Sequence, residues 1–172
     1  VQKLVRTGFG TNNVDHCTRL CHASSVAALL ENIGSGAVTA SFAECRNAEA
    51  IIVIGANPTV NHPVAATFIK NAAQRGARLY ILDPRGQHLD RYATESLRFS
   101  PGSDVAMLNA MINVIITEEL YDADYVAKQT EGFEELKVRT AHTTPEAMAP
   151  ICGVDADTLR RVARGYATAG SA

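Results

Sequence analysis

Two cysteines and a histidine near the start of the chain are the residues whose types and spacing most favour a reaction centre. Cys17 and Cys21 are one helical turn apart in sequence, and His22 follows directly. We predict that Cys21 and His22 lie in the first turn of a helix, where the positive end of the helix dipole favours a thiolate. A thiolate can ligate a metal or attack an electrophile, and the adjacent imidazole can donate or accept a proton near neutral pH.

Other interpretations of these thiols stay open at this point. A closed zinc site would need a fourth ligand besides Cys17, Cys21 and His22, and no second cysteine or histidine pair has the spacing to supply it. An isolated cysteine in an apolar context is usually a small buried hydrophobe, and this is the prediction for Cys45 and Cys152. Zinc is therefore disfavoured, whereas a metal ligand, a nucleophile and an inert thiol all remain open for Cys21.

Composition limits the class of protein. The chain has 172 residues, 47% of them hydrophobic, which is enough for one domain with a buried core and excludes a disordered chain. The net charge of −2 without a block of Lys or Arg argues against nucleic acid and anionic membranes as partners. No apolar run approaches the roughly 18–20 residues of a membrane span. Only four cysteines favour a reducing, cytoplasmic compartment. Because the chain begins at Val1 without methionine, we expect an excised internal segment of a longer protein.

A β-α-β unit is the clearest element of the pattern. Ala50–Gly55 is a continuous apolar run that ends in glycine, as in a strand buried on both faces. Pro63–Arg75 has the period of a helix with proline at its first position, and Arg78–Leu82 is a second buried run. The connection has the length of a crossover helix between parallel strands. The expected apolar stripe of this helix consists of Val64, Phe68 and Ala72.

Helices are expected on both sides of this unit in the sequence. Thr94–Phe99 is a weaker third strand, and a turn over Ser100–Asp104 leads into a long helix. Asp155 is expected to cap the last helix, as Thr144 does for the one before it. The sequence predicts one three-layer α/β domain over residues 1–172, with a parallel, Rossmann-like, doubly wound sheet and extra C-terminal helices. Further expected features are helices at Ser24–Glu31, Phe42–Ala48, Ala123–Lys128 and Phe133–Arg139, and a stripe of Leu108, Met111, Ile112 and Ile115 on the long helix.

Three expected strand ends carry small and polar residues. The first is Gly55-Ala56-Asn57-Pro58, continued to Asn61, the second is Asp83-Pro84-Arg85, and the third is Pro101-Gly102-Ser103-Asp104. Singly, these segments are ordinary turns, a surface ion pair or a helix cap. Ligands of open parallel sheets bind at the carboxyl ends of the strands, so the three together favour a nucleotide site. The dinucleotide pattern G-x-G-x-x-G is missing, which argues against NAD.

Several short motifs follow one another along the chain. They are Asn12-Asn13-Val14-Asp15, Cys17-x-x-x-Cys21-His22, Ile54-Gly55-Ala56-Asn57-Pro58, His62-Pro63, Asp83-Pro84-Arg85 and Gly102-Ser103-Asp104. Together they resemble the molybdopterin oxidoreductase family. Within that family the chain resembles the catalytic subunits of molybdenum or tungsten formate dehydrogenases in their cysteine form. The resemblance covers essentially all 172 residues.

The resemblance implies a role for each motif. Cys21 would ligate the metal, His22 would handle the proton of formate, and Cys17 would line the cofactor. The remaining site residues would hold one molybdopterin guanine dinucleotide. Gly55, Asn57 and Asn61 would contact its phosphates or guanine, Asp83 and Arg85 its ribose and phosphate, and Gly102, Ser103 and Asp104 its nucleotide end.

The resemblance also implies what a complete subunit would contain. The metal would be held by two molybdopterin guanine dinucleotides, and a [4Fe–4S] cluster would be bound by a cysteine motif outside this chain. The complete enzyme would oxidise formate to CO2 and pass electrons to an NAD- or ferredoxin-linked subunit, and we expect the isolated chain to fold without activity. Alternatives are another enzyme of the family, such as a nitrate reductase, and a cofactor-binding module without chemistry.

Overall fold

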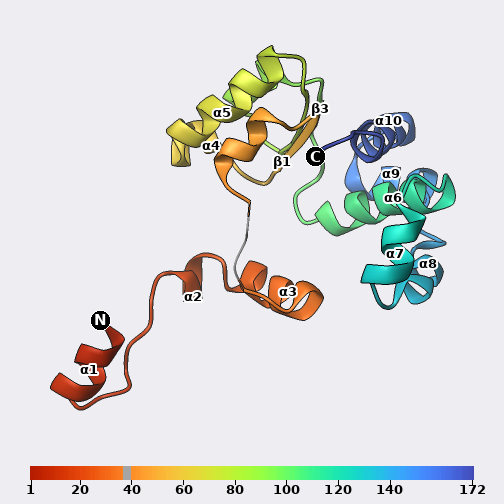
Figure 1. Cartoon of the computed structure of the whole chain (residues 1–172). Coiled ribbons are helices and arrows are strands. Elements are labelled where there is room, and N and C mark those ends of the chain that lie inside the picture. Colours follow the sequence, from red (N-terminus) through yellow and green to blue (C-terminus); the bar gives the residue numbers. More distant parts are fainter. Residues whose placement is uncertain (37–39) are drawn as a thin grey trace. The chain divides into compact units, whose positions relative to one another are not determined.

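The computed structural model describes residues 1–36 and 40–172, and the chain divides into two compact units, Val1–Ser41 and Phe42–Ala172 (Figure 1). The first unit contains the helices α1 (Gln2–Gly8), α2 (Thr18–Cys21) and α3 (Ala23–Ile33). The prediction of a helix at Ser24–Glu31 is confirmed by α3. None of the described residues of this unit is buried. Its helices therefore have no core of their own among these residues.

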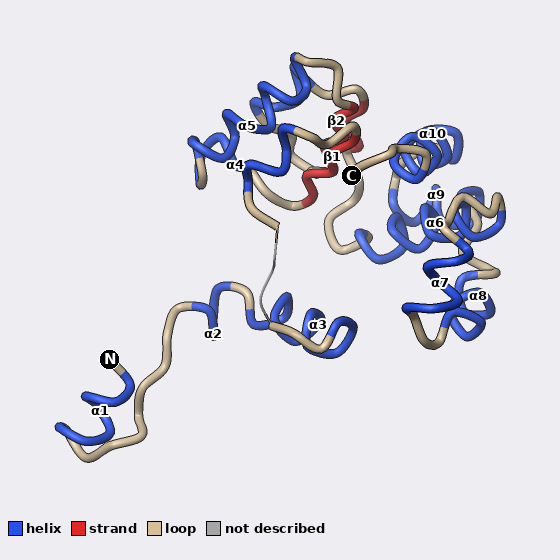
Figure 2. The backbone as a smooth tube through the Cα atoms, in the orientation of Figure 1, coloured by secondary structure: helices blue, strands red, loops and turns tan. Residues whose placement is uncertain are grey.

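The second unit is built on a small parallel sheet. Its strands β1 (Ala50–Ile54), β2 (Arg78–Leu82) and β3 (Glu95–Leu97) lie in the order β1-β2-β3 (Figure 2). Every pairing is parallel, with Ile52 opposite Tyr80 and Tyr80 opposite Glu95. The predicted β-α-β unit is confirmed, and the third strand is shorter than expected. All three strands therefore end at the same edge of the sheet.

The crossover between β1 and β2 is α5 (Pro63–Gln74), preceded by the single turn of α4 (Pro58–Asn61). The predicted apolar stripe of α5 is wrong in part, because the Val64 side chain is exposed. The buried residues are Ala65, Ala66, Ile69 and Ala72. Ile69 of this buried face joins the apolar cluster that contains Leu79 and Ile81 of β2.

The long helix is α6 (Asp104–Thr117), and its buried face also differs from the prediction. Met111 is buried as expected, but Leu108 is exposed and Met107 takes its place. Asn113 is buried on this helix and donates a hydrogen bond of 2.9 Å to the carbonyl oxygen of Thr140. This hydrogen bond satisfies the buried amide of Asn113, at a position where the apolar pattern of the helix predicts a hydrophobic residue.

Apolar side chains pack on both faces of the sheet. Tyr80 and Leu82 of β2 belong to a cluster that contains residues of α6, α9 and α10. Leu79 and Ile81, which alternate with them, belong to a second cluster with Ile69 of α5. The alternation is the period of two expected of a strand that is buried on both faces.

The remaining helices complete the second unit. The ends of the last two follow the predicted caps, since Thr144 accepts from the amide of Ala147 and Asp155 from those of Asp157 and Thr158. The predicted helix at Phe42–Ala48 is instead a short 3₁₀ helix that ends at Arg46. These elements are η1 (Phe42–Arg46), η2 (His88–Tyr92), α7 (Ala123–Gln129), α8 (Phe133–Thr140), α9 (Pro145–Cys152) and α10 (Ala156–Ala167).

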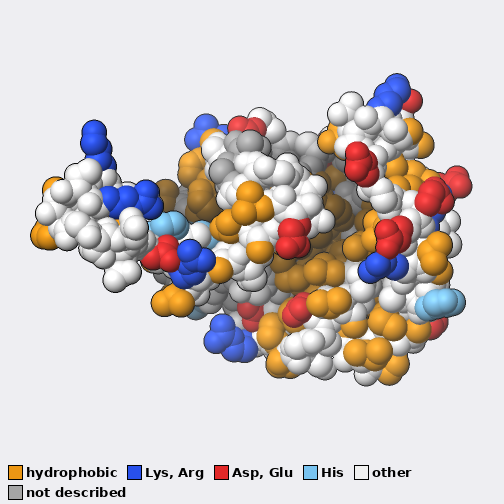
Figure 3. All heavy atoms as spheres, turned by 90° about the horizontal axis from the view of Figure 1, so that it is seen from below, with side chains coloured by type: hydrophobic (Ala, Val, Ile, Leu, Met, Phe, Trp, Pro, Cys, Tyr) orange, Lys and Arg blue, Asp and Glu red, His pale blue; other side chains and the backbone are white. Residues whose placement is uncertain are grey.

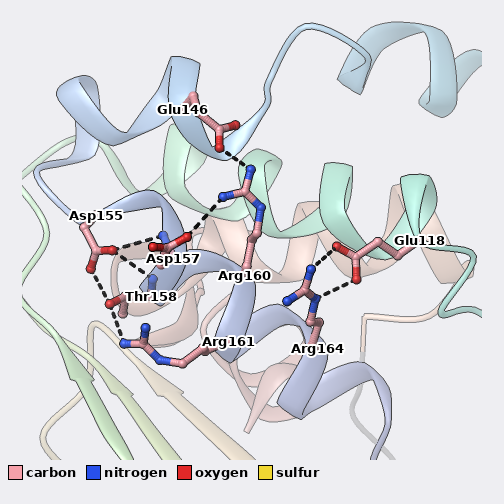
Figure 4. Close-up of polar contacts among 8 residues, drawn as sticks. All are labelled: Glu118, Glu146, Asp155, Asp157, Thr158, Arg160, Arg161 and Arg164. Atoms are coloured by element: carbon pink, nitrogen blue, oxygen red, sulfur yellow. Dashed lines mark hydrogen bonds and ion pairs between the residues drawn. The ribbon is translucent and has the colours of Figure 1, made fainter.

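Three arginines of α10 tie this helix to its neighbours. Figure 4 shows the guanidinium group of Arg164 donating to both carboxylate oxygens of Glu118, at 2.7 and 2.8 Å. These hydrogen bonds hold the pKa of the Glu118 carboxyl below its usual value. The complete set of pairs is Arg160 with Glu146 and Asp157, Arg161 with Glu95, and Arg164 with Glu118.

The surface has no single block of one charge on the face drawn in Figure 3, where basic and acidic side chains are scattered among hydrophobic ones. Within residues 1–36 and 40–172, no helix combines the length and the apolarity needed to cross a membrane. Of the two cysteines predicted to be buried, Cys152 is buried and Cys45 is only half-buried. Partial burial raises the pKa of the Cys45 thiol.

Candidate functional site

The cysteine-histidine pair lies at a break between two helices. Cys21 is the last residue of α2, and His22 is the residue before α3, with non-helical backbone angles of φ −147° and ψ 38°. The prediction that the pair occupies the first turn of a helix is therefore wrong. Cys21 lies between the C-terminal end of the four-residue α2 and the N-terminal end of the eleven-residue α3. Cys17 instead precedes the first residue of α2.

Local bonds hold the turn that leads into α2. Asp15 pairs with Arg19 at 2.7 Å, and the hydrogen bond from Arg19 holds the pKa of the Asp15 carboxyl below its usual value. The ring nitrogen Nδ1 of His16 accepts from the amide of Thr18 at 3.2 Å.

The side chains of Cys17, Cys21 and His22 are all exposed, and both thiols are free. In the described part of the chain, no three side chains of His, Cys, Asp or Glu gather where they could hold a metal ion together.

The loop after β1 presents open backbone. Gly55 has a φ of +58°, and nothing lies within 4 Å of the place where a Cβ would stand. Only glycine adopts this conformation readily, and the open space leaves its backbone accessible to a ligand. Asn57 follows, and its side-chain oxygen accepts from the hydroxyl of Thr59 at 2.6 Å. Asn61 ends α4 and is exposed. The predicted residues of this loop thus surround an accessible strand end.

The loop after β2 is shaped by a buried acid. Asp83 is 4% exposed, and its Oδ1 accepts from the amides of Arg85 at 2.8 Å and Gly86 at 3.0 Å. The carboxylate therefore fixes the loop that carries Arg85. The Arg85 side chain is exposed and makes no ion pair with the described residues. Its guanidinium group remains able to clamp an anion.

Two residues that the sequence did not single out join these loops. The side-chain nitrogen of Gln87 donates to the carbonyl oxygen of Ala56 at 2.7 Å, which links the loops after β1 and β2. Arg98, directly after β3, donates to the carbonyl oxygen of Arg85 and to Asp90, each at 2.9 Å. The position of Arg98 at a strand end was a usable signal, whereas nothing in the sequence marked Gln87.

The third predicted loop is tied to another part of the unit. Ser103 is buried, and its hydroxyl donates to the carbonyl oxygen of Ser100 at 2.6 Å. The amide of Ser100 donates to the carbonyl oxygen of Cys152 at the end of α9. Gly102 is open, with a φ of +83°, and Asp104 begins α6. Hydrogen bonds thus link the first two loops to each other, and the third to its own turn and to α9.

The donors at this edge suit a phosphate-bearing nucleotide. The free guanidinium group of Arg85 complements phosphate oxygens, whereas the amide of Gly55 already donates to the carbonyl oxygen of Leu82 at 3.0 Å. The buried side-chain oxygen of Gln87 lacks a hydrogen-bond partner in the described residues. An unsatisfied buried acceptor is uncommon in folded proteins and suits a donor group of a ligand. The residues present therefore fit a nucleotide cofactor.

Comparison with known proteins shows the family of this chain. A model of the family described as "Molybdopterin oxidoreductase" matches residues 1–160. The chain belongs to the molybdopterin oxidoreductase family. A solved structure, "Acetylene Hydratase from Pelobacter acetylenicus", is similar with a TM-score of 0.75 and 33% identity, covering 88% of this chain and 20% of that one.

Among curated relatives, "Formate dehydrogenase H" of Escherichia coli (strain K12) is 43% identical over all of this chain and 24% of its own length. The "F420-dependent formate dehydrogenase subunit alpha" of Methanocaldococcus jannaschii is 40% identical over 98% of this chain and 25% of that protein. A "Nitrate reductase" of Symbiobacterium thermophilum is 34% identical over 94% of this chain and 23% of that protein. The chain spans about a quarter of the length of these relatives.

Proposed function

We propose that this chain is the part of a formate dehydrogenase catalytic subunit that provides the metal-ligating cysteine and binds one nucleotide of the cofactor. The observation that carries the proposal is the identity of 43% and 40% to two formate dehydrogenases over nearly the whole chain, compared with 34% to a nitrate reductase. We further propose that residues 1–172 act as one domain of the three-layer, doubly wound type. The apolar clusters on both faces of the sheet support the layered arrangement of the second unit.

The proposed cofactor is molybdenum or tungsten held by two molybdopterin guanine dinucleotides, which supplies a centre able to accept two electrons. Cys21 provides the sulfur ligand from the protein, and exposure of its free thiol leaves it accessible. His22, next to it, holds or moves the proton released from formate, since a neutral imidazole accepts a proton near pH 7. Cys17 lines the cofactor from the other end of α2.

The strand ends hold one guanine dinucleotide in this proposal. Backbone at Gly55 and the side chains of Asn57 and Asn61 contact its phosphates or guanine. Asp83 and Arg85 contact ribose and phosphate, and the two backbone hydrogen bonds that Asp83 already accepts mean that it also positions Arg85. The nucleotide end is assigned to Gly102, Ser103 and Asp104.

The complete protein would have further partners. Formate is the proposed substrate, and the rest of the subunit would supply the second pterin site and a [4Fe–4S] cluster. An NAD- or ferredoxin-linked subunit would take the electrons, and the enzyme would work in the cytoplasm. Nitrate reduction is the second candidate, because a nitrate reductase is among the relatives. The histidine after the cysteine favours formate.

Assays of the complete subunit on formate and on nitrate test the proposal. We expect oxidation of formate, loss of that activity in a His22→Gln variant because the proton acceptor is weakened, and no reduction of nitrate. Turnover of nitrate without turnover of formate would contradict the assignment and favour the second candidate. Turnover that survives Cys21→Ala would favour a binding module in place of a metal ligand.

A further inference from the structure

A hollow of about 610 Å³ lies at the opposite end of the sheet from the loops described above. Its wall includes Arg78, the first residue of β2, and Glu49, which directly precedes β1. Because both strands run in the same direction, these positions lie at the amino ends of the strands. Arg46 at the end of η1 and Arg75 just after α5 complete the charged part of the wall. Three positive side chains therefore meet one negative side chain here.

None of the three arginines makes an ion pair with an acid among the described residues. Arg75 donates to the carbonyl oxygen of Arg46 at 3.3 Å, and Arg78 reaches the hydroxyl of Thr168 at 3.5 Å. Arg46 lies over the ring of Phe68, 5.2 Å from its centre. A guanidinium group has five N–H donors, so most donors of this cluster have no partner within the described residues.

The arginines of α10 differ from those at the hollow, because they form ion pairs with carboxylates. Figure 4 shows Arg160 and Arg164 each paired with at least one carboxylate. Arg161 pairs with the carboxylate of Glu95. Glu49, the carboxylate at the hollow, instead accepts from the amide of Gly170 at 2.9 Å. Three positive charges therefore meet one negative charge among the lining residues, which leaves two positive charges at the hollow without a counterpart there.

The C-terminal end of α5 lies at the hollow, and the partial negative charge of this helix end repels an anion only weakly. A helix end carries about half of an elementary charge, and its effect shrinks where the last carbonyl groups are hydrogen-bonded. The amides of Arg75, Gly76 and Ala77 cap those carbonyl groups. Three full positive charges outweigh this partial negative charge together with the charge of Glu49.

We propose that this hollow binds a small multivalent oxyanion, of the polyphosphate or polycarboxylate class, through Arg46, Arg75 and Arg78. Guanidinium groups bind phosphate and carboxylate oxygens in pairs, so three of them match an anion with two or more charged groups. The volume lies within the roughly 300–1,000 Å³ range of small-molecule sites. The site is separate from the proposed cofactor edge and does not depend on the proposed function.

Calorimetric titration of the full 172-residue chain with pyrophosphate, and separately with citrate, tests the proposal. We expect saturable binding of at least one of them at low ionic strength, although the protein has a net charge of −2. Arg75→Gln and Arg78→Gln should each weaken binding by about tenfold, because each removes a charge-assisted contact. Comparison of the two anions distinguishes a phosphate ligand from a carboxylate ligand.

Arg139→Gln is the matched control, because it removes the same charge from a guanidinium group that is already paired with Glu135. It should leave the affinity unchanged. Equal weakening by all three variants, or no binding of either anion, would overturn the proposal.

Mapping amide chemical shifts of the unmodified chain during the titration avoids any dependence on the folding of variants. Shifts confined to residues 46–49 and 75–78 are expected, and shifts only at the carboxyl ends of the strands would contradict the assignment.

Discussion

The two units of the chain hold their functional residues in different ways. At the carboxyl edge of the second unit, side chains of Gln87 and Arg98 link neighbouring loops, above a sheet with apolar clusters on both faces. In the first unit, Cys21 and His22 are exposed at a helix break, and no described residue is buried. The chain thus builds its proposed nucleotide site on its own packed core, whereas short-range hydrogen bonds among the described residues order the segment that carries the proposed metal ligand.

The largest expected effect is on the free energy of unfolding, and it should differ between a leucine of the second unit and one of the first. Leu159 of α10 is fully buried, whereas Leu20 of α2 is 94% exposed. Leu159→Ala should lower the free energy of unfolding by about 2–5 kcal/mol, because it leaves a cavity in the main cluster. Leu20→Ala should change it by less than about 0.5 kcal/mol. Urea denaturation measures both, and a comparable loss from Leu20→Ala would show that the first unit has a core that matters.

A smaller effect is expected at the link between the loops. A Cβ on Gly86, whose φ is +80°, would stand 2.3 Å from the guanidinium carbon of Arg98. Gly86→Ala should therefore displace the flexible end of Arg98 and cost about 1 kcal/mol beyond the strain of a positive φ, because the ion pair with Asp90 that it breaks is partly exposed. Gly132→Ala is the control, because Gly132 has a φ of +75° and open space around it. Equal unfolding free energies for the two variants would mean that the Arg98 link contributes nothing.

The smallest effect concerns ion pairs and their dependence on pH. Hydrogen bonds from Arg164 lower the pKa of Glu118, so the pair stabilises the folded state above the unfolded pKa of glutamate, about 4.3. That contribution is lost as the pH falls through the lower pKa of the folded state. Arg164→Gln should lower the melting temperature only slightly at pH 7, because the pair is partly exposed, and its effect should fade in acid.

The ion pair between Arg19 and Asp15 in the first unit serves as the control for the pair between Arg164 and Glu118. Arg19→Gln breaks the exposed pair with Asp15 and should leave the unfolding of the second unit unchanged at every pH. Thermal melting curves at several pH values measure both variants. An effect of Arg164→Gln that grows in acid would contradict the sign of this linkage.

Sequence predicts best where one residue pattern decides the structure. The apolar runs at Ala50–Ile54 and Arg78–Leu82 allow little besides buried strands, and Asp155 marks the start of α10 by its own hydrogen bonds. Helix faces are less certain, since Ala65, Ala66, Ile69 and Ala72 are buried on α5 whereas Val64 is exposed. Which face of a helix is buried depends on the elements that pack against it, and these are a property of the assembled fold.

The candidate site is predictable to a similar degree. Gly55, Asp83 and Arg85 follow from their positions at strand ends, and the structure places them in loops joined by hydrogen bonds. The break at His22 lacks the glycine or proline that usually signals one, so the helix pattern runs through it. The side chain of Gln87 donates a hydrogen bond to the carbonyl oxygen of Ala56, 31 positions away in sequence, and no local sequence pattern reveals such a contact.

Cofactor content and formate oxidation of the complete subunit carrying Cys21→Ser test whether metal ligation and nucleotide binding lie in different parts of this chain. Because the strand ends are assigned to the nucleotide and Cys21 to the metal, the variant should retain molybdopterin guanine dinucleotide near the level of the unmodified subunit. It should lose formate oxidation to background, while Cys45→Ala, on a half-buried thiol outside the site, should keep it. Formate oxidation that persists in Cys21→Ser would contradict the account.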